Sequence, residues 1–274
     1  MTPQVPNTAL ITGANSGIGL ELTKRLLQEG WHVRALIRSD FPATESTLAQ
    51  ALATGQLRTY RADLSQLGAL KAVLKQIIEK EEKIDVLFNN AAVSLEYLKP
   101  SPQKRDLHFE VNALVPYLIL RELKPLLLKG TLKTVVNTSS NALLMAKKFN
   151  PQTLQYPTTF RKITGIYGES KLALSLWTSA LAPSLRAEGI TIRSVCPGGN
   201  KTPMTGGKGM PGWLLLVRHL FFSHPRVGAG KLYAAAFDAP TGAFINKGKA
   251  TPLPFAHHAP EVLAMVEEIY QNEY

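Results

Sequence analysis

The sequence contains a single cysteine, Cys196, among its 274 residues. An internal disulfide is therefore impossible, and a reducing compartment fits this composition without being required by it. The chain does not open on a basic segment followed by an apolar one, so we expect no secretory signal. No apolar run reaches the ~18 residues of a membrane span, and the longest, 213–222, is interrupted by Arg218 and His219. We therefore expect a cytoplasmic protein without a membrane span.

Acidic residues are absent from two long stretches, one between Glu122 and Glu169 and the other between Glu188 and Asp238. Overall, 31 Lys and Arg outnumber 20 Asp and Glu, which gives a net charge of +11. A positive field of this kind favours a phosphorylated cofactor, an acidic substrate or nucleic acid. A solvated basic surface without any ligand explains it equally well. Basic stripes with interleaved aromatics are not evident, so we expect no nucleic-acid partner.

Metal-ligand spacing is also missing. His219, His224, His257 and His258 do not pair with acids or with Cys196 in the patterns that bind metals. We interpret them as loop or surface residues and expect no metal site.

What is present is a regular alternation of short apolar runs and longer amphipathic segments. It predicts parallel strands joined by helices that cover both faces of the sheet. No Pro/Gly/Ser linker divides the chain, so we expect one α/β domain over residues 1–274 with seven strands. The expected strands are 7–11, 31–37, 57–60, 84–88, 134–137, 190–195 and 242–246. The expected helices are 15–28, 44–54, 67–82, 104–128, 170–188 and 259–271.

Two segments, 141–166 and 203–230, interrupt this alternation, and we expect both to be excursions over one end of the sheet. The first reads as an insertion and the second as a substrate lid. Apolar residues at 213–217 and 220–222 favour a lipophilic substrate, although a helix packed on its own domain explains them as well. The lack of acids in both segments favours an anionic or amphipathic substrate instead.

A glycine cluster lies where the first predicted strand passes into the first helix. Glycines let the backbone turn tightly and approach a pyrophosphate, while the helix N-terminus offers N–H groups and a positive dipole end. The spacing is G-x-x-x-G-x-G rather than the common G-x-G-x-x-G, but its position favours dinucleotide binding over a plain turn. The residues expected to contact the cofactor are Gly13, Asn15, Ser16, Gly17, Ile18 and Gly19.

Arg38 follows the second predicted strand. An acid there would bind the ribose 2′-hydroxyl of NAD, whereas an arginine accommodates the 2′-phosphate of NADP. Arg38 therefore favours NADP(H) over NAD(H), and Asp40, two residues further on, is the argument for NAD(H). Arg34 should share the strand face of Arg38 and is a further candidate for the same contact.

Tyr167 and Lys171 are four residues apart, so they lie on one face of a helix. A lysine ammonium at this distance favours the tyrosinate and lowers the phenol pKa from its usual value of about 10. The phenol can then donate and accept a proton near neutral pH. The spacing alone also fits an aromatic ring packed on a lysine stem, so the catalytic interpretation depends on the cofactor site.

Several motifs follow one another in a fixed order between residues 7 and 205. They are the glycine cluster, Asp63-Leu64, Asn89-Asn90-Ala91-Ala92, Ser139-Ser140, Tyr167-x-x-x-Lys171 and Pro197-Gly198. In this order the sequence resembles the short-chain dehydrogenase/reductase family. The resemblance implies a Rossmann fold with a doubly wound, seven-stranded parallel sheet flanked by helices. It also implies reversible hydride transfer between NAD(P) and a carbonyl or alcohol.

The resemblance implies a catalytic group of four residues: Asn112, Ser140, Tyr167 and Lys171. Tyr167 would exchange a proton with the substrate oxygen, and Ser140, rather than Ser139, would hydrogen-bond the same oxygen. Lys171 would hold the nicotinamide ribose, and Asn112 would hold a proton-relay water. The further cofactor contacts that the resemblance implies are Asp63 and Leu64 at the adenine, Asn90 and Ala91 at the ribose side, Thr202 at the carboxamide, and Tyr167, Lys171, Pro197 and Gly198.

The sequence departs from the family pattern at several points. Ser140 and Tyr167 are 27 residues apart, about twice the family's common spacing, which resembles the retinol-dehydrogenase-like branch. Arg38 and the phrase Tyr-x-x-Ser-Lys-Leu-Ala point to the same branch. Ala92 replaces a usual glycine, and Gly199-Asn200 after Pro197-Gly198 is unusual.

These observations favour an NADP(H)-dependent oxidoreductase that interconverts a carbonyl and an alcohol on a lipophilic or amphipathic small molecule. The alternative is a non-catalytic NADP(H)-binding regulator on the same fold, which would not need all four catalytic residues. The helices expected at 104–128 and 170–188 often associate in this family. A homo-dimer or homo-tetramer is therefore possible, although nothing in the sequence fixes it.

Overall fold

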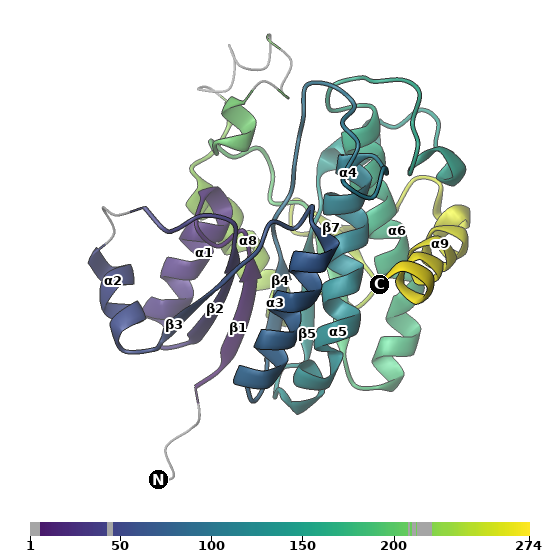
Figure 1. Cartoon of the computed structure of the whole chain (residues 1–274). Helices are drawn as coiled ribbons and strands as arrows, with labels where there is room; N and C mark the ends of the chain where they lie inside the picture. The colour runs from purple at the N-terminus through teal and green to yellow at the C-terminus, as the bar shows by residue number, and fades with distance from the viewer. Residues whose placement is uncertain (1–5, 43–45, 208, 210–211, 213–220) are drawn as a thin grey trace.

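A sheet of eight strands runs through the protein, in the order β3-β2-β1-β4-β5-β6-β7-β8 (Figure 1). The computed structural model describes residues 6–42, 46–207, 209, 212 and 221–274. All neighbouring strands are parallel except β7 and β8. The strands are β1 (Thr8–Thr12), β2 (His32–Ile37), β3 (Leu57–Arg61), β4 (Val86–Asn89), β5 (Thr134–Thr138), β6 (Thr191–Val195), β7 (Phe244–Asn246) and β8 (Lys249–Thr251).

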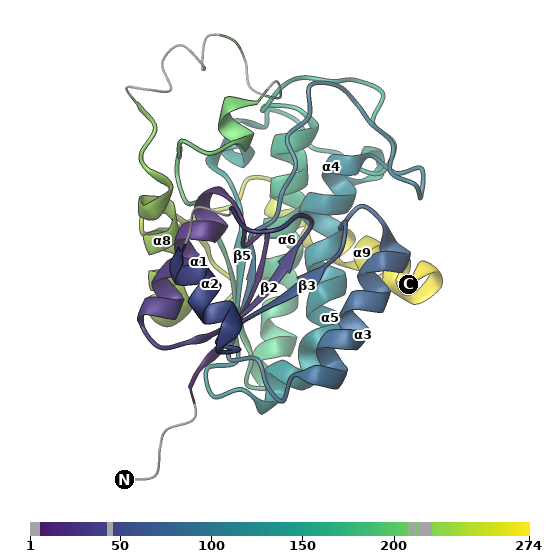
Figure 2. The same ribbon diagram turned by 60° about the vertical axis from the view of Figure 1, so that its left-hand side comes forward.

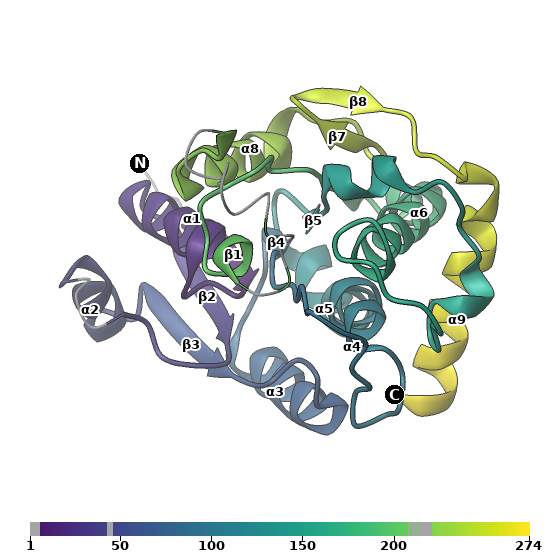
Figure 3. The ribbon, with the colours of Figure 1, turned by 90° about the horizontal axis from the view of Figure 1, so that it is seen from above.

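Helices cover both faces of this sheet, as Figure 3 shows from above. One face carries α1 (Gly17–Gln28), α2 (Ser46–Ala53) and α8 (Pro225–Asp238). The other carries α3 (Leu67–Lys80), the short α4 (Leu107–Phe109), α5 (Val115–Lys129), α6 (Ile166–Ala187) and α9 (Ala259–Glu273). The predicted doubly wound α/β Rossmann architecture is therefore confirmed. None of the helices in the described part of the chain is long and apolar enough to cross a membrane.

Two apolar clusters, one on each side of the sheet, form the core. One joins the sheet to α3, α5, α6 and α9, and the other joins it to α1, α2 and α8. Strand β1 has all five residues buried because both of its faces are covered. A central parallel strand therefore reads as a continuous apolar run rather than an alternating one.

The prediction of seven strands is wrong by one, because β8 returns beside β7 as an antiparallel strand. The turn consists of Lys247, with a φ of 51°, and Gly248, with a φ of 76°. Two successive residues with positive φ form the type of two-residue turn that joins hairpin strands. With three residues and no apolar alternation, β8 leaves no strand pattern in the sequence.

Helix α8 was not among the predicted helices, and 225–230, expected in the lid, belong to it. It begins at Pro225, which suits a first-turn position, and the His224 ring accepts a hydrogen bond from the Arg226 N–H at 3.2 Å. Gly228 and Gly230 argue against a helix by propensity. Gly228 nevertheless leaves room for the Asn200 side chain, because a Cβ there would lie 2.8 Å from it and would force it to shift.

Three further short helical turns lie above or beside the sheet. They are η2 (Asn141–Met145), η3 (Pro151–Thr153) and η4 (Met204–Gly206). The loops after β4, β5 and β6 gather above the carboxyl ends of the strands (Figures 1 and 2). A single π-helical turn, η1 (Glu110–Leu114), joins α4 to α5, and η5 (Ala256–His258) precedes α9.

Candidate active site

A cleft of about 1040 Å³ lies along the carboxyl ends of the parallel strands. Its lining comes from the loops after β1 to β6 and from the start of α6. The strand order reverses between β1 and β4, and ligands of open α/β sheets bind at such a point. The cleft contains all of the residues predicted for cofactor binding and catalysis except Gly19, Asn112 and the further candidate Arg34.

The glycine cluster shapes the floor of the cleft between β1 and α1. Gly13 and Gly17 adopt positive φ values of 66° and 52°, which side chains with a Cβ rarely tolerate. A Cβ on Gly19 would lie 2.1 Å from the Gly13 carbonyl oxygen. Gly19 therefore allows the first turn of α1 to pack on the loop, although it does not itself line the cleft.

Thr12 joins the glycine loop to the loop after β4 and was not predicted as a site residue. Its hydroxyl accepts hydrogen bonds from the backbone N–H groups of Asn90 and Ala91, both at 2.9 Å. The Asn90 side chain donates back to the Thr12 carbonyl at 3.1 Å. The two loops on either side of the switch point are thus held together by side-chain to backbone bonds.

At the end of the cleft formed by the loops after β2 and β3, Arg38 is exposed and lines the cleft. Asp40 is held by Arg61, whose guanidinium NH1 lies 3.4 Å from each carboxylate oxygen. The Asn15 side chain donates to the Ser39 carbonyl at 2.6 Å and so fixes the loop that carries both residues. Arg61 was not predicted, because a lone arginine at a strand end carries no motif.

Arg34 does not take part in this site. It is buried and forms a salt bridge of 2.5 Å with Glu81. Glu81 also pairs with Arg58 at 2.7 Å. The strand alternation does put Arg34 on the predicted face of β2. Arg34 lies four residues before Arg38, however, and pairs with Glu81 instead. The expected cofactor contact of Arg34 is therefore wrong.

Tyr167 and Lys171 lie in the first two turns of α6, which begins four residues earlier than predicted. The Lys171 side chain is buried, and its Nζ donates to the Thr138 carbonyl at 2.8 Å. Ser140 lines the cleft and hydrogen-bonds the phenol of Tyr167. The hydroxyl of the neighbouring Ser139 instead pairs with Ser175 at 2.8 Å.

Burial dominates the protonation of this pair. It raises the pKa of Tyr167 to about 12, and the hydrogen bond from Ser140 opposes the shift only in part. Burial also lowers the pKa of Lys171 to about 7. The prediction that Lys171 lowers the Tyr167 pKa is therefore wrong, because the net shift of that pKa is upward. The charged form of each side chain is disfavoured away from water, and the lysine is directed at a carbonyl.

Asn112 lies beneath the cleft rather than in it, in the π-helical turn η1. Its fully buried side chain accepts from the Val93 N–H at 2.8 Å and donates to the Val93 carbonyl at 3.0 Å. It also donates to the Ser170 hydroxyl at 3.1 Å, and Ser170 donates to the Tyr167 carbonyl at 2.8 Å. Asn112 thus connects the loop after β4 to the backbone of Tyr167, at the kind of turn that often marks functional sites.

The unusual Gly199-Asn200 pair links the loop after β6 to α8. The buried Asn200 side chain donates to the Gly198 carbonyl at 2.8 Å and accepts from the Gly228 N–H at 3.1 Å. A Cβ on Gly199 would lie 2.9 Å from the Phe222 ring, which lines the cleft. The pair therefore places an aromatic wall beside the site.

The segment 141–166 forms a further part of the lining. Its residues Met145, Lys162, Ile163 and Thr164 line the cleft together with Tyr167. Gly209 packs on the loop after β4, because a Cβ there would lie 2.1 Å from the Ser94 carbonyl oxygen. Most of the apolar run expected to form a lid, 213–220, lies outside the described residues.

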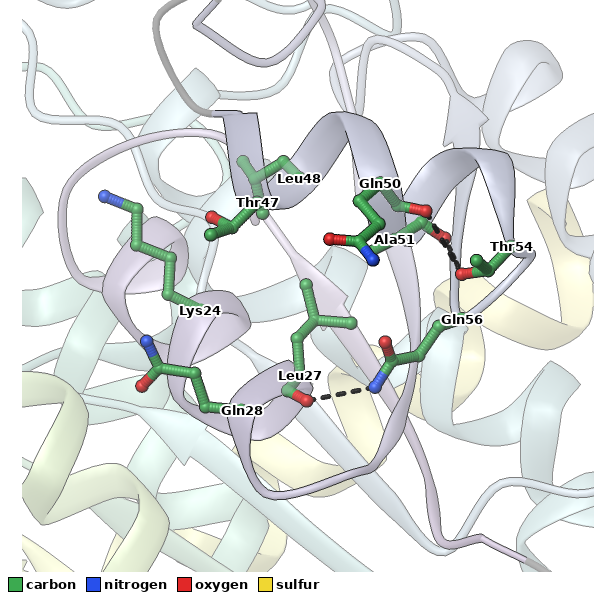
Figure 4. A pocket seen from close by; sticks show the side chains of 9 residues that line it. All are labelled: Lys24, Leu27, Gln28, Thr47, Leu48, Gln50, Ala51, Thr54 and Gln56. Atoms are coloured by element: carbon green, nitrogen blue, oxygen red, sulfur yellow. Dashed lines mark hydrogen bonds between the residues drawn. The ribbon is translucent and has the colours of Figure 1, made fainter.

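A second, smaller pocket of about 240 Å³ lies between α1 and α2 (Figure 4). Figure 4 shows the Gln56 side chain turned toward the Leu27 carbonyl, to which it donates at 3.0 Å. Lys24 is the only titratable residue among those lining this pocket. The lining of this pocket therefore contains no pair of an acid and a base that could catalyse proton transfer. The described residues also include no group of three or more His, Cys, Asp and Glu placed to hold a metal ion.

A glycine-lined helix N-terminus at the switch point of a parallel sheet defines a dinucleotide-binding α/β protein. Tyr167 and Lys171, on the first two turns of α6, add a possible proton donor and a lysine to this dinucleotide site. The family model described as short chain dehydrogenase matches residues 7–210. The chain belongs to the short-chain dehydrogenase family.

Curated relatives include retinol dehydrogenases. The chain is 34% identical over 206 residues to "Retinol dehydrogenase 12" of Mus musculus, a match that covers 71% of this chain and 62% of that protein. It is 29% identical over 238 residues to "Retinol dehydrogenase 11" of Mus musculus, which covers 85% and 74% respectively. The chain thus spans under two thirds of the first relative's length. The retinol-dehydrogenase-like branch is confirmed.

Solved structures of the same fold include an "NADPH bound carbonyl reductase from chicken fatty liver", with a TM-score of 0.67 and 22% identity. That match covers 90% of this chain and 98% of the other. A "4-hydroxyisoleucine dehydrogenase complexed with NADH" has a TM-score of 0.66 and 24% identity over 87% and 96%. At these identities the likeness supports the fold.

Proposed function

We propose that the protein is an NADP(H)-dependent oxidoreductase that interconverts a carbonyl and an alcohol on a lipophilic or amphipathic small molecule. The observation that carries this proposal is that Ser140, Tyr167 and Lys171 lie in one cleft with the glycine cluster and Arg38. A proton donor, an oxyanion partner and a dinucleotide site are the parts that carbonyl reduction requires.

The residues present fit a nicotinamide dinucleotide. The glycines leave backbone where a Cβ would clash, as at Gly17, whose Cβ would lie 3.0 Å from the Thr202 side chain. The start of α1 then offers N–H groups to a pyrophosphate. Arg38 would bind the 2′-phosphate, and Arg61 offsets the negative charge of Asp40. NADPH, when bound, supplies the hydride from nicotinamide C4.

The chain's own groups then handle the proton. Tyr167, with a pKa raised to about 12, keeps its proton at neutral pH and donates it to the carbonyl oxygen. Ser140 hydrogen-bonds the same oxygen where negative charge develops. Lys171 would hold the nicotinamide ribose. Asn112, which holds the Tyr167 backbone through Ser170, keeps the donor in place and supports a water that returns the proton.

The names of the relatives bear on two parts of the proposal, the substrate and the cofactor. Retinol dehydrogenase relatives act on a lipophilic alcohol by name, which agrees with apolar cleft residues such as Met145 and Phe222. Structures of the same fold are described with NADPH in one case and NADH in another. The preference for NADP(H) therefore rests on Arg38 and on the pairing of Asp40 with Arg61.

The second candidate, a non-catalytic NADP(H)-binding regulator, predicts cofactor binding without turnover. A panel of aldehydes, ketones and alcohols with NADPH, NADH and their oxidised forms separates the two. We expect carbonyl-dependent NADPH oxidation, and we expect Tyr167→Phe to lower kcat at least ~100-fold while NADPH still binds. Full turnover by that variant would refute the role of Tyr167, and binding without any turnover across the panel would favour the regulator.

A further inference from the structure

Charges are distributed unevenly along the cleft. Among the described residues that line it, the acids are Asp40 and Asp63, which follow β2 and β3. Ser140 follows β5, three strands from β2 in the sheet order, or about 14 Å at the usual strand spacing. The half of the cleft that contains Tyr167 and Ser140 therefore has no acid among its described residues.

The cations that line the cleft are Arg38, Lys99, Lys162 and Lys171. Burial raises the pKa of Asp63, but hydrogen bonds from Ser65 and the charges of Arg38 and Lys99 bring it below its usual value. Arg38 and Lys99 therefore act at the end of the cleft formed by the loops after β2 and β3. Lys171 is buried against the Thr138 carbonyl. Lys162 lines the cleft from the segment that leads into α6, five residues before Tyr167.

The backbone around Lys162 is held in an unusual conformation. Ile163 has a φ of 62°, which is a genuine outlier for a β-branched residue. The Thr164 N–H donates to the Lys162 carbonyl at 2.7 Å, and the Gly168 N–H donates to the Ile163 carbonyl at 2.9 Å. These bonds fasten the turn to the start of α6. Strain of this kind persists where the surroundings over-determine it and is concentrated at functional sites.

Apolar residues also line the cleft from the segment that carries Lys162 and from the segment after β6. Met145 and Ile163 come from the same segment as Lys162, and Met204, Phe221 and Phe222 come from the segment after β6. A substrate that fits both features has an apolar body and one negative charge. The acid-free composition of both segments removes the repulsion that such a charge would otherwise meet.

We propose that Lys162 is a specificity-determining residue that binds a carboxylate on the substrate, at the end remote from the reacting carbonyl. The substrate class is then an aliphatic oxo acid or the corresponding hydroxy acid rather than a neutral carbonyl compound. This inference rests on the proposed function for the reacting end of the cleft, but it concerns a separate contact.

The test compares aliphatic ω-oxo carboxylic acids of increasing chain length with their methyl esters. We expect kcat/KM with NADPH to be higher for the best acid than for its ester by about 10-fold or more, as for a hydrogen bond between charged groups. Lys162→Met keeps the apolar stem, so this acid-to-ester ratio should fall to near one, and Lys162→Arg should restore much of it. Lys148→Met is the matched control, because Lys148 is exposed in the same segment and does not line the cleft.

A binding measurement separates this inference from the proposed function. Calorimetric titration of the Tyr167→Phe protein with NADPH and the same acids and esters needs no turnover. Weaker acid binding after adding Lys162→Met to that variant supports the carboxylate site even if no substrate is reduced. An acid-to-ester ratio of one in the wild type, or a ratio that Lys162→Met leaves unchanged in turnover and in binding, overturns the inference while leaving the proposed function intact.

Discussion

Lys171 destabilises the fold at neutral pH, because its ammonium group is buried against the Thr138 carbonyl. Burial lowers its pKa from 10.5 to about 7. The unfolded chain therefore binds more protons than the folded chain between about pH 7 and pH 10.5. Stability rises with pH wherever the unfolded state binds more protons, so this residue destabilises the fold as the pH falls through that window.

Replacing Lys171 with Met should accordingly increase the free energy of unfolding at about pH 7, and the gain should shrink toward about pH 10. Urea unfolding of the variant and the wild type at both pH values measures the difference. An equal gain at the two pH values, or a loss only at the lower one, would contradict the buried-charge explanation. The same variant should lose activity, since Lys171 lines the cleft.

Arg61 provides a second test at the scale of single residues. Its pairing with Asp40 is exposed, with relative exposures of 62% and 84% for the two side chains, so its energetic effect is small. Arg61→Ala should nevertheless release the Asp40 carboxylate and weaken NADPH binding by about threefold while NADH binding changes less. The measurement is the dissociation constant of each cofactor, with the exposed Arg186→Ala as control. Equal changes for both cofactors would argue against a role in discrimination.

At the scale of single residues, some features of the site could be predicted from the sequence and others could not. Helical spacing correctly predicted that Tyr167 and Lys171 share one region of the cleft. It could not predict their pKa values, because these depend on burial that only the folded chain creates. Arg34 and Arg38 look equivalent in an alternating strand, yet Glu81 from the end of α3 captures Arg34. Thr12 carries no motif, so its bonds to the loop after β4 could not be predicted.

At the scale of elements, Asn200 joins the loop after β6 to the beginning of α8. Its side chain is 2% exposed and makes hydrogen bonds to three backbone groups. Asn200→Ala should leave the Gly228 N–H without its acceptor and lower the free energy of unfolding by about 1–3 kcal/mol. Urea unfolding tests this, with the exposed Asn272→Ala as a control expected to change within about 0.5 kcal/mol. A loss no larger than that of the control would contradict the coupling.

The predicted elements differ from the observed ones for physical reasons. Helices with a clear apolar stripe, such as α1 and α3, were predicted within a few residues of their observed bounds. Helix α8 was missed because small residues, including Gly228, serve its close packing on Asn200. Strand β8 was missed because three residues beside a tight turn show no periodicity.

For the molecule as a whole, the C-terminal helix α9 packs along α6 and α5. Tyr270 of α9 stacks edge-on with Tyr117 at 6.3 Å between ring centroids, and Glu267 pairs with Arg121 at 2.7 Å. The same α5 and α6 helices are those through which the family resemblance suggests association. A homo-oligomer stays a prediction, and an interface on the side of α5 and α6 that α9 covers would include or displace α9.

The overall architecture was the most predictable feature, because the alternation of apolar runs and amphipathic segments encodes a parallel sheet directly. The sequence also predicted which loops form the cleft, since the carboxyl ends of parallel strands share one edge. The specific geometry of the 141–166 segment was not predictable. It depends on the left-handed turn at Ile163, which no local composition requires.

In the proposed function, this cleft transfers hydride from NADPH to a carbonyl carbon while Tyr167 supplies the proton. The most direct measurement is single-turnover reduction with NADPH carrying deuterium at both hydrogen positions of nicotinamide C4, followed by mass spectrometry and NMR of the product. We predict an alcohol with one deuterium on its carbinol carbon for the wild type, and no labelled alcohol on the same timescale for Tyr167→Phe with bound NADPH. Bound NADPH that never transfers its label to any carbonyl tested, or equal transfer by the variant, would contradict this mechanism.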